Sequence, residues 1–376
     1  MFGLSNGCRR AAASISKPLY RPSWVCRSAS RISIPTPPPF PVIETCPGPT
    51  CQCREVPEKM EIDRESPING TTPAYAEQIL ISTGHSNWKS RIEDDSEAVF
   101  LRQLKKHLGR NGKYSDVSPQ LPFHNVLITN SSFKPTPLRK DAIADRDYFT
   151  ENALRKPPAR EATDETAFSR PASAFLVPSF RYVPSIPIDD GSVEAFLKAF
   201  VLPSQLHAHH DSLTRAQKEV LLRQPEMQAQ FTGARPVNEI LILICGHMAR
   251  DRRCGVMAPV LTAEFADKLR RQNVEVLDDQ SPPPESDNYD QAIQEFRPTA
   301  RIGSISHIGG HKFAGNVIVY IPPSFSNNAL RGKGIWYRRV EPAHVEGIVA
   351  QTVLGGKVIR ELFSGGVGQD GEILRL

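Results

Sequence analysis

The stretch Glu239-Ile-Leu-Ile-Leu-Ile-Cys-Gly-His247 decides how the C-terminal half of this chain of 376 residues is expected to fold. Its apolar run predicts a buried β-strand that ends at Cys245. A polar loop follows, which we expect to be flexible and to contain Cys254. Apolar side chains then recur at helical spacing from Pro259 to Arg271. The order strand, loop, helix is typical of an α/β unit.

The N-terminal half repeats this pattern. Ile79-Leu-Ile-Ser-Thr-Gly-His85 parallels Leu241-Ile-Leu-Ile-Cys-Gly-His247, and each is followed by a polar loop and a helix. Self-similarity of this kind indicates an internal repeat. We therefore expect an α/β protein built from two related units, of which the first lacks metal ligands.

Composition limits the classes of protein to which the chain can belong. Its length suffices for two domains of ordinary size. No run reaches the roughly 20 apolar residues of a membrane span, so we expect none. The net charge of +5 comes from residues 1–43, which hold six of the 46 basic residues and no acidic one. The remainder carries 40 basic and 41 acidic residues, so we expect no nucleic-acid partner.

Residues 1–34 are rich in Arg and Ser and contain no Asp or Glu. This composition is typical of a mitochondrial transit peptide, although an ordinary disordered basic N-terminus shares it. We expect a mitochondrial location, in the matrix. The seven cysteines are odd in number and mostly far apart, which is unlike a secreted disulfide framework.

Composition and periodicity together predict the domain organisation. The expected segments are a transit peptide (1–34), a Pro-rich linker that contains cysteines (35–58), an N-terminal α/β domain (59–202) with a disordered excursion (134–171), a linker with a helix (203–238), a C-terminal α/β domain (239–363) with an insertion (280–298), and a tail (364–376). The Pro-rich linker cannot form a regular element. It holds Cys46, Cys51 and Cys53, which are close enough in sequence to bind a metal or to form a disulfide, but a cluster without a fourth ligand is a weak metal signal.

Four side chains form the candidate site: Cys245, Cys254, His307 and His311. Two soft thiolates and two imidazoles from two separate loops are a donor set for a metal ion or an iron–sulfur cluster. The pair Gly309-Gly310 separates the histidines, and glycine allows the backbone to pass close to a bulky inorganic group.

Three interpretations of this donor set stay open. A [2Fe–2S] cluster takes four protein ligands, and His in place of Cys raises its reduction potential. A zinc ion accepts the same four ligands and would indicate a zinc-stabilised, non-redox interaction protein. A thiol-redox protein would use Cys245 and Cys254 directly. A Rieske site is excluded, because Cys245-Gly-His247 has no matching Cys-x-x-His in the sequence.

Longer motifs surround these residues. They are Cys245-x8-Cys254 with Ala258-Pro259, His307-x-Gly-Gly-His311-Lys-Phe-Ala-Gly-Asn316, and Trp336-Tyr-x2-Val340-x-Pro342. Together they resemble the sucrase/ferredoxin-like family of thioredoxin-like [2Fe–2S] ferredoxins, over roughly residues 55–363.

The resemblance implies a thioredoxin-like ferredoxin domain over residues 239–363. It also implies a [2Fe–2S] cluster whose ligands are Cys245, Cys254, His307 and His311. His247 lies inside the motif, and we expect it beside the ligands rather than among them.

The predicted chemistry favours an electron carrier or redox regulator over an enzyme with its own substrate. The sequence offers no paired catalytic carboxylates in a convincing context, so glycosidase activity is not supported. The missing Cys-x-x-Cys argues against a conventional thioredoxin oxidoreductase. The expected partners are an unidentified redox protein and the iron–sulfur assembly machinery.

Overall fold

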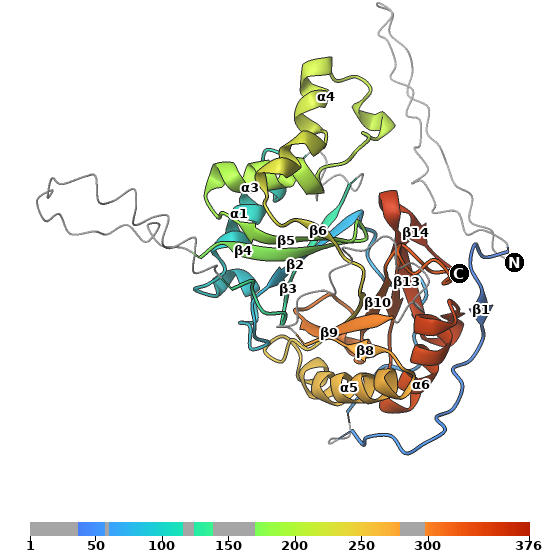
Figure 1. Ribbon diagram of the computed structural model, residues 1–376. Coiled ribbons are helices and arrows are strands. Elements are labelled where there is room, and N and C mark those ends of the chain that lie inside the picture. The colour runs from blue at the N-terminus through green and yellow to red at the C-terminus, as the bar shows by residue number, and fades with distance from the viewer. Residues whose placement is uncertain (1–36, 57–59, 116–123, 138–169, 279–297) are drawn as a thin grey trace, which may run out of the picture. The chain divides into compact units, whose positions relative to one another are not determined.

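The computed structural model describes residues 37–56, 60–115, 124–137, 170–278 and 298–376, which are coloured in Figure 1. The expected transit peptide lies outside these residues, as do nearly all of the expected excursion and insertion. Within the described ranges, no helix is both long and apolar enough to cross a membrane.

Most of the described strands join one mixed sheet that runs through both halves of the chain. Its order is β14-β13-β11-β10-β7-β9-β3-β2-β4-β5-β6, and β8 pairs with β9 beside this path. The strands are β2 (Glu77–Ser82), β3 (Val126–Ser131), β4 (Ala172–Val177), β5 (Arg181–Ile186), β6 (Arg235–Pro236), β7 (Ile240–Cys245), β8 (Glu275–Val276), β9 (Thr299–Ile305), β10 (Val317–Ile321), β11 (Lys333–Tyr337), β13 (Phe363–Gly368) and β14 (Ile373–Leu374).

Two modules with the same connectivity make up the centre of this sheet. In the first, β2 is parallel to β3 and antiparallel to β4, which pairs with β5. In the second, β7 is parallel to β9 and antiparallel to β10, which pairs with β11. A helix joins the parallel strands of each module, α1 (Val99–Leu108) or α5 (Arg252–Arg271), and another follows its last strand, α3 (Asp190–Phe196) or α6 (Pro342–Ile348).

This repeated arrangement confirms the expected α/β, thioredoxin-like fold with two related units. The remaining helical segments are α4 (Arg215–Leu221), π-helical turns that continue α3 and α6 (Leu197–Val201 and Val349–Leu354), and 3₁₀ turns at Ile92–Asp94, Ala208–His210, Pro225–Gln230, His311–Phe313, Arg360–Leu362 and Gln369–Gly371. Strands of both modules belong to the same sheet. The domain boundaries that we expected at residues 202 and 239 stay a prediction.

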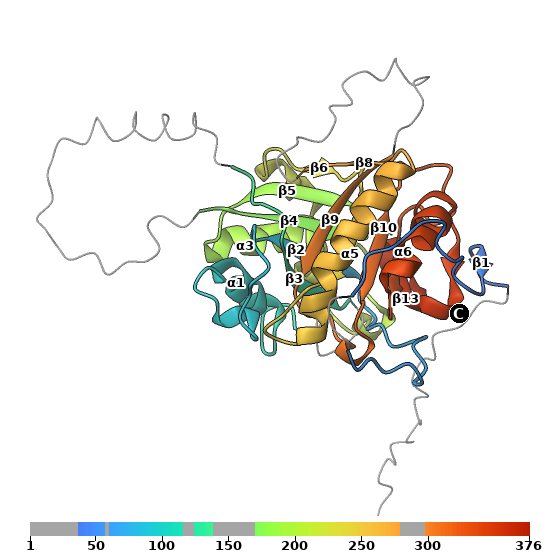
Figure 2. The same ribbon diagram turned by 90° about the horizontal axis from the view of Figure 1, so that it is seen from below.

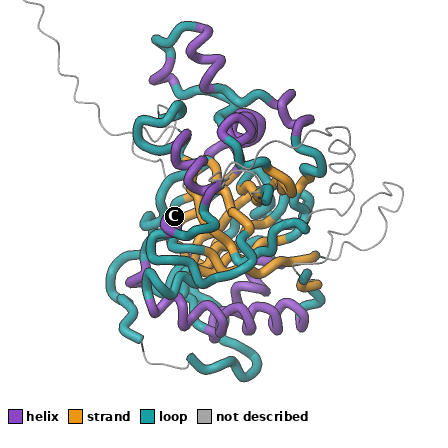
Figure 3. The backbone as a smooth tube through the Cα atoms, turned by 90° about the vertical axis from the view of Figure 1, so that its left-hand side faces the viewer, coloured by secondary structure: helices purple, strands orange, loops and turns teal. Residues whose placement is uncertain are grey.

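Strand β7 is buried on both faces, which explains its unbroken apolar run. Its isoleucines pack in one core cluster with α5 and α6, whereas Leu241, Leu243 and Cys245 pack in another that includes Phe175 of the first module. Each such buried side chain contributes about 1.5–3 kcal/mol. Helix α5 covers β7 and β9 with α6 beside it (Figure 2), and strands lie between helices in Figure 3.

Two segments that we expected to be irregular form regular structure. In the Pro-rich segment, β1 (Val42–Ile43) pairs in parallel with β12 (Val358–Ile359). The expected tail from residue 364 onward continues β13 and forms β14. Its glycines serve close packing, because a Cβ at Gly366 would lie 2.7 Å from the carbonyl oxygen of Gly334 in β11. Sequence alone makes such a Gly-rich stretch look like a loop.

Candidate cysteine–histidine site

Cys245 is the last residue of β7 and is held between two neighbouring strands. Its backbone N–H donates to the carbonyl of Asn316 at 3.0 Å, and the next N–H, of Gly246, donates to Ile305 at 3.1 Å. The cysteine is only 2% exposed. The hydrogen bonds therefore fix the sulfur inside the sheet, at the end of β7 where the chain leaves for α5.

Cys254 lies in the first turn of α5, and our expectation that it occupies a flexible loop was wrong. The helix begins at Arg252 rather than at Pro259, because the side chain of Asp251 caps it by accepting a hydrogen bond from the N–H of Arg253. Pro259 is accommodated inside the helix. The cap gives Cys254 a defined position, and its side chain is 1% exposed.

The two cysteine side chains interact directly. Hydrogen bonds from Cys254 and His307 hold the pKa of Cys245 well below its ordinary value, against the opposing effect of burial. The hydrogen bond to Cys245 and burial raise the pKa of Cys254. One sulfur is therefore favoured as an anion, and the other shares its proton with it.

The two histidines lie in the turn that follows β9. Their ring centroids are 5.4 Å apart. His307 Nδ1 is buried, and among the described residues it has no hydrogen-bond partner. A buried ring nitrogen without a partner is unusual and calls for an explanation. His311 is exposed and lies within electrostatic range of Asp251, the cap of α5.

The glycines between the histidines differ in their surroundings. Both have positive φ, 84° at Gly309 and 69° at Gly310, which favours glycine. A Cβ at Gly310 would lie 1.5 Å from an amino nitrogen of Arg338, whereas one at Gly309 would meet no atom within 4 Å. The turn is thus tightly packed on one side and open on the other.

Arg338 is a feature that we did not expect from the sequence. It is 1% exposed, and its guanidinium donates to Asn316 Oδ1 at 2.6 Å and to the carbonyl of Gly309 at 3.2 Å. Burial lowers its pKa to about 10, opposed by the nearby Cys245 and Cys254, so it stays a cation at neutral pH. The sequence signal that could have pointed to Arg338 was its position two residues after Trp336, within one of the motifs that carry the family resemblance.

His247 is buried and joins the site to the first module. Its Nδ1 accepts a hydrogen bond from the N–H of His307 at 3.1 Å, so Nε2 carries the proton and donates to the carbonyl of Lys89 at 2.9 Å. Its ring packs edge-on against Trp88, with centroids 5.8 Å apart. His247 thus lies beside the four candidate ligands and supports one of them.

The structure brings Cys245, Cys254 and His307 into contact and places His311 next to His307. Within the described parts of the chain, no three or more His, Cys, Asp or Glu side chains are arranged around a point that holds one metal ion. Cys46, Cys51 and Cys53 belong to another region, between α5 and α6.

Comparison with known proteins identifies the family. Residues 68–365 match the model of the family described as sucrase/ferredoxin-like. The chain belongs to this family. Its relatives include three proteins, from different organisms, that carry the name Altered inheritance of mitochondria protein 32. That of Debaryomyces hansenii is 27% identical over 336 residues, which cover 86% of this chain and 96% of the relative.

The other two relatives differ in the length of the match. That of Meyerozyma guilliermondii is 24% identical over 334 residues, 86% of this chain and 94% of the relative. That of Clavispora lusitaniae is 36% identical over 133 residues, 35% and 36% of the two chains. No solved structure matches significantly. The resemblance that the sequence motifs indicated is therefore confirmed at the level of the family.

Proposed function

We propose that this chain is a mitochondrial protein that binds a [2Fe–2S] cluster through Cys245, Cys254, His307 and His311, and that it acts in electron transfer or redox regulation. The observation that carries the proposal is the contact between two buried cysteines and His307, whose ring nitrogen Nδ1 is buried with no partner among the described residues. Thiolate and imidazole are the protein ligands of such clusters.

The arrangement of the donors supports a cluster more than a single ion. The cysteines form one adjacent pair and the histidines another. A [2Fe–2S] cluster has two irons that take two ligands each, whereas a structural zinc ion needs four donors around one centre. The open space at Gly309 offers room beside the histidines.

The chain's own residues would set the properties of the site. A bound cluster would accept and return one electron, and its imidazole ligands would raise the reduction potential. Arg338 provides a buried positive charge near the sulfurs, which favours added negative charge. His247 fixes the backbone of His307. The apolar cluster around Cys245 keeps water from the sulfur side of the site.

Two observations support a mitochondrial location. The relatives' names refer to the inheritance of mitochondria, and residues 1–34 have the composition of a transit peptide. We place the protein in the matrix, with a redox protein and the iron–sulfur assembly machinery as partners. The near-neutral charge of the remaining chain argues against a nucleic-acid partner.

A second candidate function is thiol redox chemistry at Cys245 and Cys254. The lowered pKa of Cys245 beside a second thiol supports it, because the thiolate is the attacking species in disulfide exchange. Such a protein would cycle between the dithiol and a Cys245–Cys254 disulfide.

Anaerobic purification of the full chain tests these alternatives. We expect a coloured protein that contains iron and acid-labile sulfide and is bleached by dithionite. His307→Ala and His311→Ala should remove or shift the visible bands, whereas the exposed control His209→Ala should not. A colourless protein with bound zinc, or one with only a reducible disulfide, would overturn the cluster proposal.

A further inference from the structure

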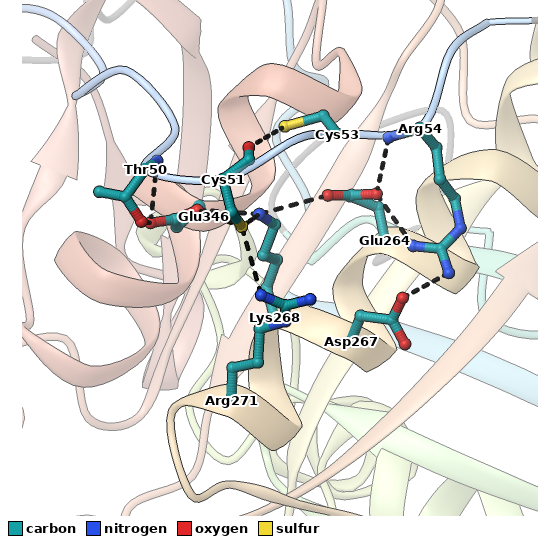
Figure 4. Close-up of polar contacts among 9 residues, drawn as sticks. All are labelled: Thr50, Cys51, Cys53, Arg54, Glu264, Asp267, Lys268, Arg271 and Glu346. Carbon is teal, nitrogen blue, oxygen red and sulfur yellow. Dashed lines mark hydrogen bonds and ion pairs between the residues drawn. The ribbon is translucent and has the colours of Figure 1, made fainter.

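The N-terminal segment, residues 37–56, lies against α5 and α6 and carries three cysteines (blue in Figures 1 and 2). Strand β1 anchors it at one end. At the other end Arg54 donates to Glu264 at 3.0 Å and also binds Asp267, both on α5 (Figure 4). The cysteines are free thiols. They therefore occupy an ordered surface rather than a loose linker.

Cys51 differs from its neighbours because cations contact its sulfur. Lys268 Nζ donates to Cys51 Sγ at 2.8 Å, and Arg271 donates to it at 3.5 Å (Figure 4). The side chain of Lys268 is 3% exposed, and its ammonium also pairs with Glu346 at 2.8 Å and Glu264 at 3.5 Å. Although burial opposes it, hydrogen bonds with Cys51 and Glu346 raise the pKa of Lys268, so it stays charged.

The carboxylates in this cluster are already paired. Glu346 accepts a hydrogen bond from the Cys51 thiol at 3.5 Å, and it also accepts hydrogen bonds from Lys268 and from Thr50. These contacts lower its pKa to about 2. Glu346 therefore stays a carboxylate at neutral pH, and the proton that Cys51 loses when it reacts passes to water. Cys51 is half-buried, and its sulfur lies next to the exposed Arg271.

The other two cysteines have different surroundings. The thiol of Cys46 donates to the carbonyl of His344 at 3.4 Å, and that of Cys53 to the carbonyl of Cys51 at 3.6 Å. Burial and Glu361 raise the pKa of Cys46 to about 11, so that only about one molecule in a thousand is a thiolate there at pH 8. Burial also raises the pKa of Cys53. These cysteines are internal controls for Cys51.

We propose that Cys51 is a site of reversible thiol modification, at which the sulfur that Lys268 and Arg271 contact exchanges, as the thiolate, with small anionic disulfides. The thiolate attacks one sulfur of the disulfide, the S–S bond breaks, and a mixed disulfide forms on Cys51. The other half leaves as a thiolate and takes a proton from water. Cys51 is oxidised and the released thiol is reduced, so electrons balance.

The preference for an anionic reagent follows from the exposed side of the site. Arg271 is exposed and reaches the sulfur from the solvent side. A carboxylate on the incoming disulfide can therefore approach a positive charge, whereas an ammonium group is repelled. Glutathione disulfide has the required chemistry, and cystamine is its cationic counterpart. The proposal does not depend on a cluster at Cys245 and Cys254.

The test exposes the full-length protein to glutathione disulfide for graded times and maps the modified peptides by mass spectrometry. We expect Cys51 to be modified first, Cys51→Ser to abolish this early modification, and Cys46→Ser to leave its rate unchanged. Arg271→Gln changes only an exposed side chain and should slow the reaction about two- to fivefold. It should also reduce the preference for glutathione disulfide over cystamine.

Three outcomes would overturn the proposal: equal modification of Cys46, Cys51 and Cys53, first reaction at Cys46 or Cys53, or an unchanged rate at Cys51 in Arg271→Gln. A circular dichroism melt of each variant shows that it is folded. Because the readout is the mass of a peptide, the result is distinct from the presence or absence of visible absorption at the cluster site.

Discussion

The two modules share one connectivity but use the turn after their first strand differently. In the second module Cys245 ends the strand directly before this turn, and its sulfur contacts Cys254 and His307. The first module has Thr83 at the corresponding place. Its hydroxyl accepts a hydrogen bond from Trp88 Nε1 at 3.0 Å and donates to the carbonyl of Ser131 at 2.8 Å. The comparison shows that one scaffold either satisfies this turn with hydrogen bonds from a threonine or places a buried cysteine there, next to a second cysteine and a histidine.

The largest effect should come from replacing Cys245, the cysteine at the end of the first strand of the second module. We expect Cys245→Ser to remove essentially all of the visible absorption of the purified protein, because one of four ligands is lost and a hydroxyl is a poor iron donor. The matched substitution in the first module, Thr83→Ala, should leave iron content and spectrum unchanged. Equal loss in both variants would contradict the assignment of the ligands to the second module alone.

The next prediction compares two ion pairs, one on each of the helices that join the parallel strands of a module. On α5, Lys268 is buried between Glu264 and Glu346, so Lys268→Met removes the ammonium that both carboxylates share and should cost about 3–5 kcal/mol of unfolding free energy. On α1, Lys106 pairs with Asp190 at the surface. There, Lys106→Met should cost less than about 1 kcal/mol. Urea denaturation of both variants measures the difference.

A third prediction concerns acid sensitivity of the first module. Burial lowers the pKa of His124 to about 4. Because its folded pKa is below the unfolded value of about 6.5, its contribution to stability is complete above pH 6.5 and is lost as the pH falls toward 4. The expected loss is about 2 kcal/mol by pH 5.

The control for this prediction is His124→Gln, which does not titrate and keeps an N–H near the carbonyl of Val201. Glu77 acts in the opposite direction, because burial raises its pKa to about 7 and its contribution is lost as the pH rises from 4.5 to 7. Urea midpoints of wild type and variant at pH 5 and pH 7 separate the two effects. Parallel pH profiles would contradict the role of His124.

Apart from the surface control Lys106→Met, the smallest effect should be that of Thr83→Ala on stability. Removing the hydroxyl leaves the buried indole N–H of Trp88 without its acceptor, and we expect a loss of about 1–2 kcal/mol. Thermal melting measures this loss, and Thr83→Ser, which keeps the hydroxyl, is the control. An equal loss in both would show that the methyl group, rather than the hydrogen bond, is what matters.

Much of the fold could be predicted from the sequence because its signals are local. The apolar run before Cys245 and its echo before Thr83 indicate the central strands of both modules, and both were found. The start of α5 was missed because a single capping residue, Asp251, outweighs the helix-breaking tendency of Pro259 eight positions later.

The parts of the site that escaped prediction depend on contacts between distant segments. Arg338 reads as one of many basic residues, and only the fold places its guanidinium behind Gly309 and beside Asn316. Likewise, Cys51 resembles Cys46 in sequence, and the difference comes from Lys268, more than two hundred positions away. Periodicity and spacing carry no information on such partners.

The contact between the two modules affects how substitutions in the first module should be interpreted. Asn130 in β3 exchanges hydrogen bonds with Ser306, since its carbonyl accepts from the Ser306 N–H at 2.9 Å and its N–H donates to Ser306 Oγ at 3.0 Å. Ser306 directly precedes His307. A substitution at Asn130 in the first module can therefore disturb the backbone next to His307, and a fragment that begins at β7 would lack both of these hydrogen bonds.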